Sequence, residues 1–150
     1  IKPICVRGQI CYHFCMARTI LIVEDDVALA NLYKTELETN GYTVIHVAEG
    51  VQALDSIKQN TPDLVLLDIM LPGKNGLEIL QDMRADDALK EAKVIMLTNF
   101  GNEENVSTAL ELGALDYVMK YKITPSEMSA KIASLLGDTT DSVVKVMSRL

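Results

Sequence analysis

The sequence TILIVEDD at residues 19–26 is an apolar run of strand length that ends directly in three acidic residues. Thr19–Val23 is uninterrupted and rich in β-branched residues, which is typical of a parallel strand buried on both faces. Asp26 is placed to cap a helix that ends near Asn40 and Gly41. The apolar residues of this helix recur at helical spacing: Leu29, Leu32, Tyr33 and Leu37. These residues therefore predict a buried strand, an acidic loop and a helix in succession.

The same alternation of an apolar run and a helical pattern continues along the chain. The further strand-length runs are Thr43–Val47, Leu64–Asp68, Lys93–Leu97 and Asp116–Met119. The further helical patterns begin near Gly50, Leu77, Asn102 and Thr124, the last with a capping box and a proline at its first turn. Because neighbouring parallel strands need right-handed crossovers, this alternation predicts an α/β fold, a doubly wound five-stranded parallel sheet with helices on both faces.

Length and cysteine distribution indicate the domain organisation. The 150 residues suit a single domain, which we expect at residues 17–137, followed by a tail or linker at 138–150. Residues 1–16 hold all three cysteines and no acid, and we expect them to be a leader of appended or upstream sequence. The odd cysteine count lacks the spacing of a disulfide framework or a zinc site, and the cysteine-free remainder favours a reducing, cytoplasmic location.

The charge balance excludes several classes of partner. The chain has 14 basic and 21 acidic residues, a net charge of −7, and such a surface is repelled by nucleic-acid phosphates and anionic lipids. No run reaches the ~20 apolar residues that a membrane span requires. The sequence therefore predicts a soluble domain that binds neither nucleic acid nor membrane directly.

Polar residues gather where the predicted strands end, which is the ligand-binding edge of doubly wound sheets. They are Glu24, Asp25, Asp26, Asp68, Thr98 and Lys120. At an effective dielectric constant of ~20 and a separation of ~5 Å, each pair of like charges costs about 3 kcal/mol, which one lysine does not offset. Either some carboxyls are protonated or a hard divalent cation binds, and oxygen ligands favour magnesium over zinc. Asp26 is best interpreted as the helix cap.

This cluster has a definite chemical capability. A magnesium-bound Asp68 can act as a nucleophile toward a phosphoryl group and form an acyl phosphate. The Lys120 ammonium and the Thr98 hydroxyl would then bind the phosphoryl oxygens.

Residues 18–137, about four-fifths of the chain, resemble the receiver domain of two-component response regulators, chemotaxis receivers among them. The matching motifs are ILIVEDD at 20–26, LLDIMLPG at 66–73 followed by Asn75 and Gly76, MLT at 96–98, and Gly113-Ala114 with Tyr117 and Lys120. The resemblance implies a flavodoxin-like sheet with strand order 2-1-3-4-5.

The resemblance also implies roles for individual residues. Asp68 would be the phosphoacceptor, and it would bind Mg²⁺ directly together with Asp25 and the Met70 carbonyl, while Glu24 would bind through water. Thr98 and Tyr117 would be the switch pair, whose hydroxyl and ring move when Asp68 is phosphorylated.

The implied function is a phosphorylation-dependent signalling switch. A histidine kinase or phosphotransfer protein would donate to Asp68, and the helix after the fourth strand, the fifth strand and the last helix would present the changed surface to an output partner. The chain would not be an enzyme beyond its own phosphotransfer and dephosphorylation. Whether this face also forms a homodimer stays open.

Two positions depart from the family pattern. The family usually has a small residue after the switch hydroxyl, where this chain has Asn99, which would crowd the phosphoryl group or alter its hydrolysis. The family's lysine usually precedes a proline through a cis bond, but Tyr121 follows Lys120 here. Because a cis bond without proline costs ~2.5–4 kcal/mol, we expect a trans bond in this loop.

Two alternative functions remain at the level of sequence. The first is a magnesium-dependent phosphohydrolase with Asp68 as a transient nucleophile, although such enzymes commonly carry a second acid where this chain has Met70. The second is a flavin carrier of the same architecture. It would need a phosphate-binding loop after the first strand, where residues 24–26 instead repel phosphate.

Overall fold

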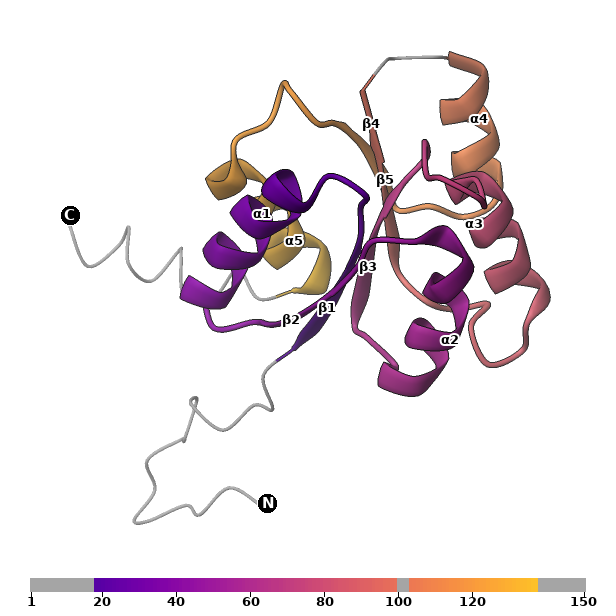
Figure 1. The fold of residues 1–150 in the computed structure, drawn as a ribbon, viewed down its shortest axis with the longest axis horizontal. Helices are drawn as coiled ribbons and strands as arrows, with labels where there is room; N and C mark the ends of the chain where they lie inside the picture. Colours follow the sequence, from indigo (N-terminus) through magenta and orange to yellow (C-terminus); the bar gives the residue numbers. More distant parts are fainter. Residues whose placement is uncertain (1–17, 100–102, 138–150) are drawn as a thin grey trace, which may run out of the picture.

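The computed structural model describes residues 18–99 and 103–137, and Figure 1 shows the alternating strands and helices of this part. The strands are β1 (Thr19–Val23), β2 (Thr43–Val47), β3 (Leu64–Asp68), β4 (Val94–Thr98) and β5 (Asp116–Met119). The helices are α1 (Val27–Thr39), α2 (Gly50–Asn60), α3 (Gly76–Ala85), α4 (Glu103–Glu111) and α5 (Pro125–Leu136). The expected leader, the expected tail and Asn102 lie outside the described residues.

The sheet is parallel with strand order β2-β1-β3-β4-β5, which confirms the predicted doubly wound α/β fold. Helices α1 and α5 cover one face, and α2, α3 and α4 cover the other (Figure 1). Successive side chains of a strand point to opposite faces, so Ile20 and Ile22 pack under α1 and α5, while Leu21 and Val23 pack under the other three helices. This two-sided burial explains the uninterrupted apolar run of β1.

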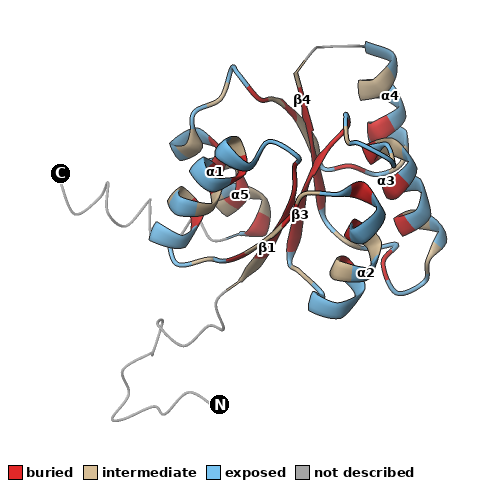
Figure 2. Cartoon of the chain, in the orientation of Figure 1, coloured by how far each residue is buried: buried red, intermediate tan, exposed pale blue. Residues whose placement is uncertain are grey.

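Burial follows the strand order. Strands β3 and β4 are buried along their whole length, whereas the edge strands β2 and β5 are buried only in part (Figure 2). The helix surfaces that face solvent are exposed. Within the described residues, no helix is long and apolar enough to span a membrane.

The helix ends follow the predicted chemistry. The Asp26 side chain accepts a hydrogen bond from the Leu29 amide at 3.1 Å and so caps α1. Thr124 and Glu127 form the expected capping box of α5, with Pro125 at its start. These side-chain acceptors satisfy amides that a helix leaves unpaired at its first turn.

Three details differ from the sequence prediction. Strand β4 runs from Val94 to Thr98, one residue later than expected, which makes Thr98 the last strand residue. Helix α3 begins at Gly76, one residue before Leu77, because Asn75 caps it. Leu32 is 57% exposed although it fits the helical spacing, since the core-facing stripe of α1 runs through Ala30, Tyr33 and Leu37 instead.

Gly76 brings α3 directly against the end of β3. A methyl group at this position would overlap the backbone carbonyl of Asp68. The Gly76 amide also donates to the Ile69 carbonyl at 2.9 Å. The absence of a side chain therefore lets the first turn of α3 pack on the strand end that carries Asp68.

Candidate functional site

The carboxyl ends of β1, β3, β4 and β5 meet at one edge of the sheet. In the strand register Val23 lies beside Leu67, Asp68 beside Leu97, and Thr98 beside Met119. The ladder continues one residue further, because the Glu24 amide donates to Val47 O at 3.0 Å and the Lys120 amide donates to Thr98 O at 2.8 Å. Backbone hydrogen bonds thus fix the residues that carry the polar side chains.

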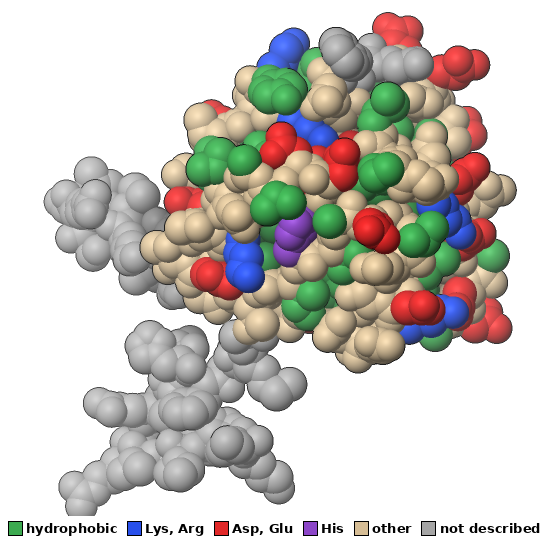
Figure 3. Space-filling view, in the orientation of Figure 1, with side chains coloured by type: hydrophobic (Ala, Val, Ile, Leu, Met, Phe, Trp, Pro, Cys, Tyr) green, Lys and Arg blue, Asp and Glu red, His purple; other side chains and the backbone are tan. Residues whose placement is uncertain are grey.

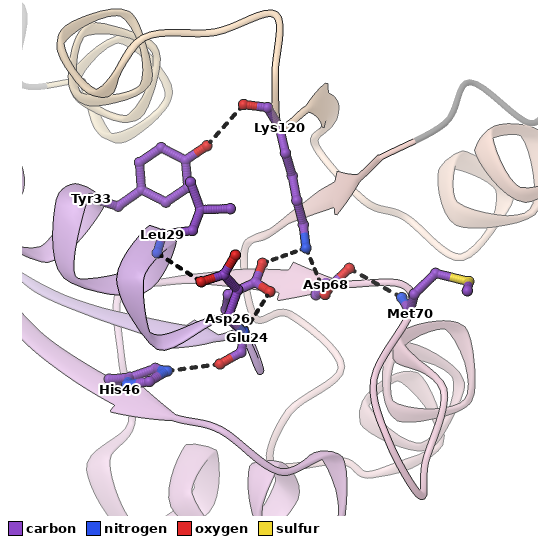
Figure 4. A network of polar contacts seen from close by, with 8 residues as sticks. All are labelled: Glu24, Asp26, Leu29, Tyr33, His46, Asp68, Met70 and Lys120. Carbon is purple, nitrogen blue, oxygen red and sulfur yellow. Dashed lines mark hydrogen bonds and ion pairs between the residues drawn. The ribbon is translucent and has the colours of Figure 1, made fainter.

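Glu24, Asp68 and Lys120 form a buried cluster at this edge (Figure 4). The Lys120 Nζ lies 2.7 Å from Asp68 Oδ2 and 2.6 Å from Glu24 Oε2, and the three residues are 0–5% exposed. The second oxygens accept backbone amides: Asp68 Oδ1 from Met70 and Glu24 Oε1 from Asp26, both at 3.1 Å. Glu24 Oε2 is in ion-pair contact with Lys120 but receives no hydrogen bond within the described part of the chain. The carboxyl of Glu24 is therefore only partly satisfied.

Burial controls the protonation of this cluster. Burial raises the pKa of Glu24 from 4.5 to about 7, against the opposing effect of the adjacent Lys120 ammonium. Burial also raises the pKa of Asp68 above its usual value, again opposed by Lys120. Burial alone would lower the pKa of Lys120, but its contacts with Asp68 and Glu24 outweigh burial and raise it. Lys120 stays an ammonium, and a pKa of about 7 allows Glu24 to exchange a proton near neutral pH.

The acidic residues at this edge can hold a metal ion. Glu24, Asp25 and Asp68 each offer a carboxylate oxygen, and these oxygens lie within 4.8 Å of one another. Asp25 is exposed, so the cluster is open to solvent on one side. An all-oxygen, negatively charged donor set with room for water suits a hard divalent cation such as Mg²⁺.

The structure places the remaining predicted residues around the cluster. Met70 is 66% exposed and follows Asp68 by two positions, with its amide on the Asp68 carboxylate. Thr98 is buried at the end of β4, and its backbone carbonyl holds Lys120. Tyr117 is half-buried on β5, beside Met96 in the register, and packs against the core under α2, α3 and α4. The geometry therefore joins Lys120 to Glu24, Asp68 and Thr98, and it places Tyr117 on the neighbouring strand.

The profile of the family described as "Response regulator receiver domain" matches residues 20–133 of this chain. The chain belongs to this family. Receiver domains are signalling modules of two-component systems, so family membership makes the chain a phosphorylation-dependent signalling domain.

Curated relatives of the receiver domain include longer regulators. The DNA-binding response regulator MtrA of Mycobacterium tuberculosis is 36% identical over 133 residues, which are 89% of this chain and 57% of the relative. The probable transcriptional regulator ycf27 of Guillardia theta is 38% identical over 120 residues, 80% of this chain and 46% of that protein. The chain thus spans about half the length of these relatives.

Solved structures resemble the whole fold of the receiver domain. A CheY-like response regulator receiver domain protein from Methanospirillum hungatei has a TM-score of 0.75 at 33% identity, covering 85% of this chain and 99% of that chain. The BeF3-activated N-terminal receiver domain of Klebsiella pneumoniae RstA has a TM-score of 0.72 at 34% identity, covering 79% of this chain and 98% of that chain. None of these comparisons supports the phosphohydrolase or the flavin-carrier alternative.

Two contacts of the receiver domain were missed at the level of sequence. The His46 ring Nε2 lies 2.8 Å from the Glu24 carbonyl, and the Tyr33 hydroxyl donates to the Lys120 carbonyl at 3.4 Å (Figure 4). His46 could have been found from the predicted strand order, because it lies beside Ile22 on the strand next to β1. Tyr33 carried no such signal, since its helical spacing indicated only a core residue.

The structure also describes the two residues at which the chain departs from the family pattern, Tyr121 and Asn99. Tyr121 is 78% exposed, and the Lys120–Tyr121 bond is trans, as expected for a residue other than proline. Asn99 is half-buried, and its Oδ1 is a buried oxygen with no hydrogen-bond donor among the described residues. On the face seen in the orientation of Figure 1, acidic and hydrophobic side chains are intermixed (Figure 3).

Proposed function

We propose that Asp68 accepts a phosphoryl group from the phosphohistidine of a histidine kinase or phosphotransfer protein. The observation that carries this proposal is the buried Asp68 carboxylate at the sheet edge, 2.7 Å from the Lys120 ammonium and beside Glu24 and Asp25. A carboxylate in this setting is held in one orientation, with a positive charge in place for incoming oxygens.

The transfer is a displacement at phosphorus. An oxygen of Asp68 forms the new O–P bond while the P–N bond to the donor imidazole breaks. The leaving nitrogen keeps the electron pair, and a proton already on the second ring nitrogen makes the departing imidazole neutral. The product is an acyl phosphate on Asp68 and a neutral histidine on the donor. Lys120 and the Thr98 hydroxyl stabilise the negative charge on the phosphoryl oxygens.

Magnesium is the cofactor that we propose for this step. Asp25, Asp68 and the Met70 carbonyl would bind it directly, and Glu24 would bind it through water. The bound cation supplies electrostatic stabilisation of the transferring phosphoryl group. The cluster of three carboxylates supports this assignment.

Phosphorylation of Asp68 would act on partners by changing the conformation of one surface of the domain. We assign the switch to Thr98 and Tyr117, and the presented surface to α4, β5 and α5, which would control an output partner or meet a second copy of the chain. The reaction would be limited to the domain's own phosphotransfer and dephosphorylation. The relatives named as DNA-binding regulators are longer, so we assign no nucleic-acid contact to this acidic domain, and we place it in the cytoplasm.

The test is intact-mass measurement after incubation with Mg²⁺ and acetyl phosphate. We expect one added phosphoryl group, which is lost in Asp68→Asn and after chelation of the metal. Asp55→Asn, which removes an exposed carboxylate from α2, is the matched control and should be phosphorylated normally. An unchanged mass of the wild-type chain, under conditions that modify another receiver domain, would overturn the proposal.

A further inference from the structure

The turn after β5 carries the lysine of the site without the restraint of a proline. The Lys122 amide donates to the Met119 carbonyl at 3.1 Å, which closes a turn with Lys120 and Tyr121 at its centre. Such a turn uses the carbonyl of its first residue and the amide of its last, so the Lys120 carbonyl takes no part in closing it. Tyr121 is exposed and lacks the pyrrolidine ring with which a proline would fix the φ angle at this position. The orientation of the Lys120–Tyr121 peptide therefore depends on contacts from outside the turn.

Tyr33 supplies such a contact from helix α1. Its hydroxyl donates to the Lys120 carbonyl at 3.4 Å, across 87 positions of sequence (Figure 4). The side chain is 1% exposed and packs in the core between the sheet, α1 and α5. Because close packing holds the ring in one rotamer, the hydroxyl is a fixed point against which the turn rests. Burial raises the pKa of Tyr33, so the hydroxyl keeps its proton and remains a donor.

Lys120 is thus held at three separate points. Its amide donates to Thr98, its carbonyl accepts from Tyr33, and its ammonium contacts Glu24 and Asp68. Phosphorylation would change the third contact, because the ammonium would then bind phosphoryl oxygens. The two backbone contacts must keep the long side chain aimed at Asp68 while that exchange takes place.

We propose that Tyr33 is a positioning residue for the phosphorylation of Asp68, and that it acts through the backbone of Lys120. This inference rests on the proposed function of Asp68. In this chain a tyrosine hydroxyl on α1 restrains the turn from outside, where a proline after the lysine would restrain it from within.

The test is a double-mutant cycle on the phosphorylation rate. Tyr33→Phe removes the hydroxyl but keeps the ring, and we expect the rate with Mg²⁺ and acetyl phosphate to fall about fivefold, the equivalent of one net hydrogen bond. In a Lys120→Ala background, followed over long incubations, the same substitution should leave the slower rate unchanged. A residue that merely stabilised the core would have the same effect in both backgrounds.

A matched control and a second measurement complete the test. Tyr42→Phe removes the hydroxyl of a partly buried tyrosine that packs against the same core beyond the last residue of α1, and it should leave the rate unchanged. Backbone amide NMR signals of Lys120 and Tyr121 should shift in Tyr33→Phe and not in Tyr42→Phe.

The outcomes separate the two proposals. An unchanged rate in Tyr33→Phe, or equal slowing in both backgrounds, would overturn the role of Tyr33 while the phosphorylation of Asp68 stands. A wild-type chain that gains no phosphoryl group would overturn the proposed function and this inference with it.

Discussion

Lys120 and Arg84 each bring a positive charge into the folded chain, at opposite ends of the sheet. Lys120 lies at the carboxyl ends of the strands and contacts two carboxylates, Glu24 and Asp68. Arg84, from the last turn of α3, donates to five backbone carbonyls in the loops that lead into β4 and β5, at 2.6–3.4 Å. These carbonyls belong to Leu89, Lys90, Ala92, Leu112 and Gly113, and with Arg84 they form what we call the arginine clamp.

The difference lies in what the partners can do. Backbone carbonyls neither titrate nor react, so the arginine clamp is a permanent connection between α3 and two loops. The carboxyls of Glu24 and Asp68 titrate, and in the proposed function they also meet a metal ion and a phosphoryl group, so the contacts of Lys120 would be exchangeable. Among the described residues, the two buried side-chain oxygens without a hydrogen bond, on Glu24 and Asn99, both lie at the Lys120 end. These two oxygens thus lie at the end of the sheet where we propose that Asp68 is phosphorylated.

The largest expected effect is that of Lys120→Met. Removal of the ammonium leaves two buried acids without their cation, and we expect a loss of about 4 kcal/mol in the free energy of unfolding at pH 8. Burial holds the pKa of Glu24 near 7 even with lysine present, above the 4.5 of the unfolded chain. Without the ammonium this pKa is higher still, so the folded variant takes up the Glu24 proton at a higher pH than the wild-type chain does, and the loss shrinks as the pH falls from 8 toward 7. Below about pH 7 both chains gain stability together, down to the unfolded value of 4.5. Denaturant unfolding at several pH values measures this.

A second variant checks the cause of that loss. Glu24→Gln in the Lys120→Met background removes one of the two competing acids, and we expect it to restore much of the stability at pH 8. A loss that is the same at pH 5 and pH 8, and that Glu24→Gln leaves unchanged, would place its origin in packing rather than in charge.

Arg84→Met is expected to cost about 3 kcal/mol, because it leaves several half-buried carbonyls without a donor. Since neither the guanidinium nor the carbonyls titrate between pH 5 and 8, the loss should be the same throughout that range. Lys58→Met is the control, since it removes an exposed cation that pairs with Asp86 at 2.9 Å and should cost far less. A loss of stability in Arg84→Met that depends on pH would contradict the claim that only the Lys120 end of the sheet depends on titrating groups.

Metal binding should stabilise only the Lys120 end. With free Mg²⁺ at ten times its dissociation constant, we expect a gain of about 1.4 kcal/mol, which chelation reverses. Asp25→Asn should abolish the gain, whereas Asp26→Asn should keep it, because Asp26 serves as the helix cap and asparagine caps equally well. Thermal unfolding with and without Mg²⁺ measures both variants. If Asp25→Asn keeps the gain in stability, the metal binds at residues other than the predicted ligands.

The sequence alone predicted the features that depend on residue type and spacing. The buried run Thr19–Val23 gave the first strand, the capping box at Thr124 gave the last helix, and the strand ends gave the cluster of Glu24, Asp68 and Lys120. These predictions succeed because strand period, helix capping and the alignment of parallel strand ends follow from local chemistry and one topological rule.

The remaining features depend on contacts between side chains and distant backbone. Arg84 binds carbonyls, which every residue possesses, so no pattern of residue types marks its partners. Tyr33 contacts the Lys120 carbonyl for the same reason without a sequence signal. The face of α1 that meets the sheet was likewise set by packing against α5, which left Leu32 exposed. Only the assembled fold determines such contacts.

The smallest expected effect is that of Asn99→Ala, beside Thr98. Removal of a buried oxygen that lacks a donor relieves its desolvation cost, and lost packing offsets part of this, so we expect a gain of about 0.5 kcal/mol in the free energy of unfolding. If the amide also crowds the phosphoryl group, the variant should be phosphorylated faster by acetyl phosphate. Denaturant unfolding and intact mass measure the two effects. A loss of stability would show that contacts of the Asn99 amide nitrogen stabilise the fold. The polar atoms at the Lys120 end would then make more hydrogen bonds than the two unpaired oxygens indicate.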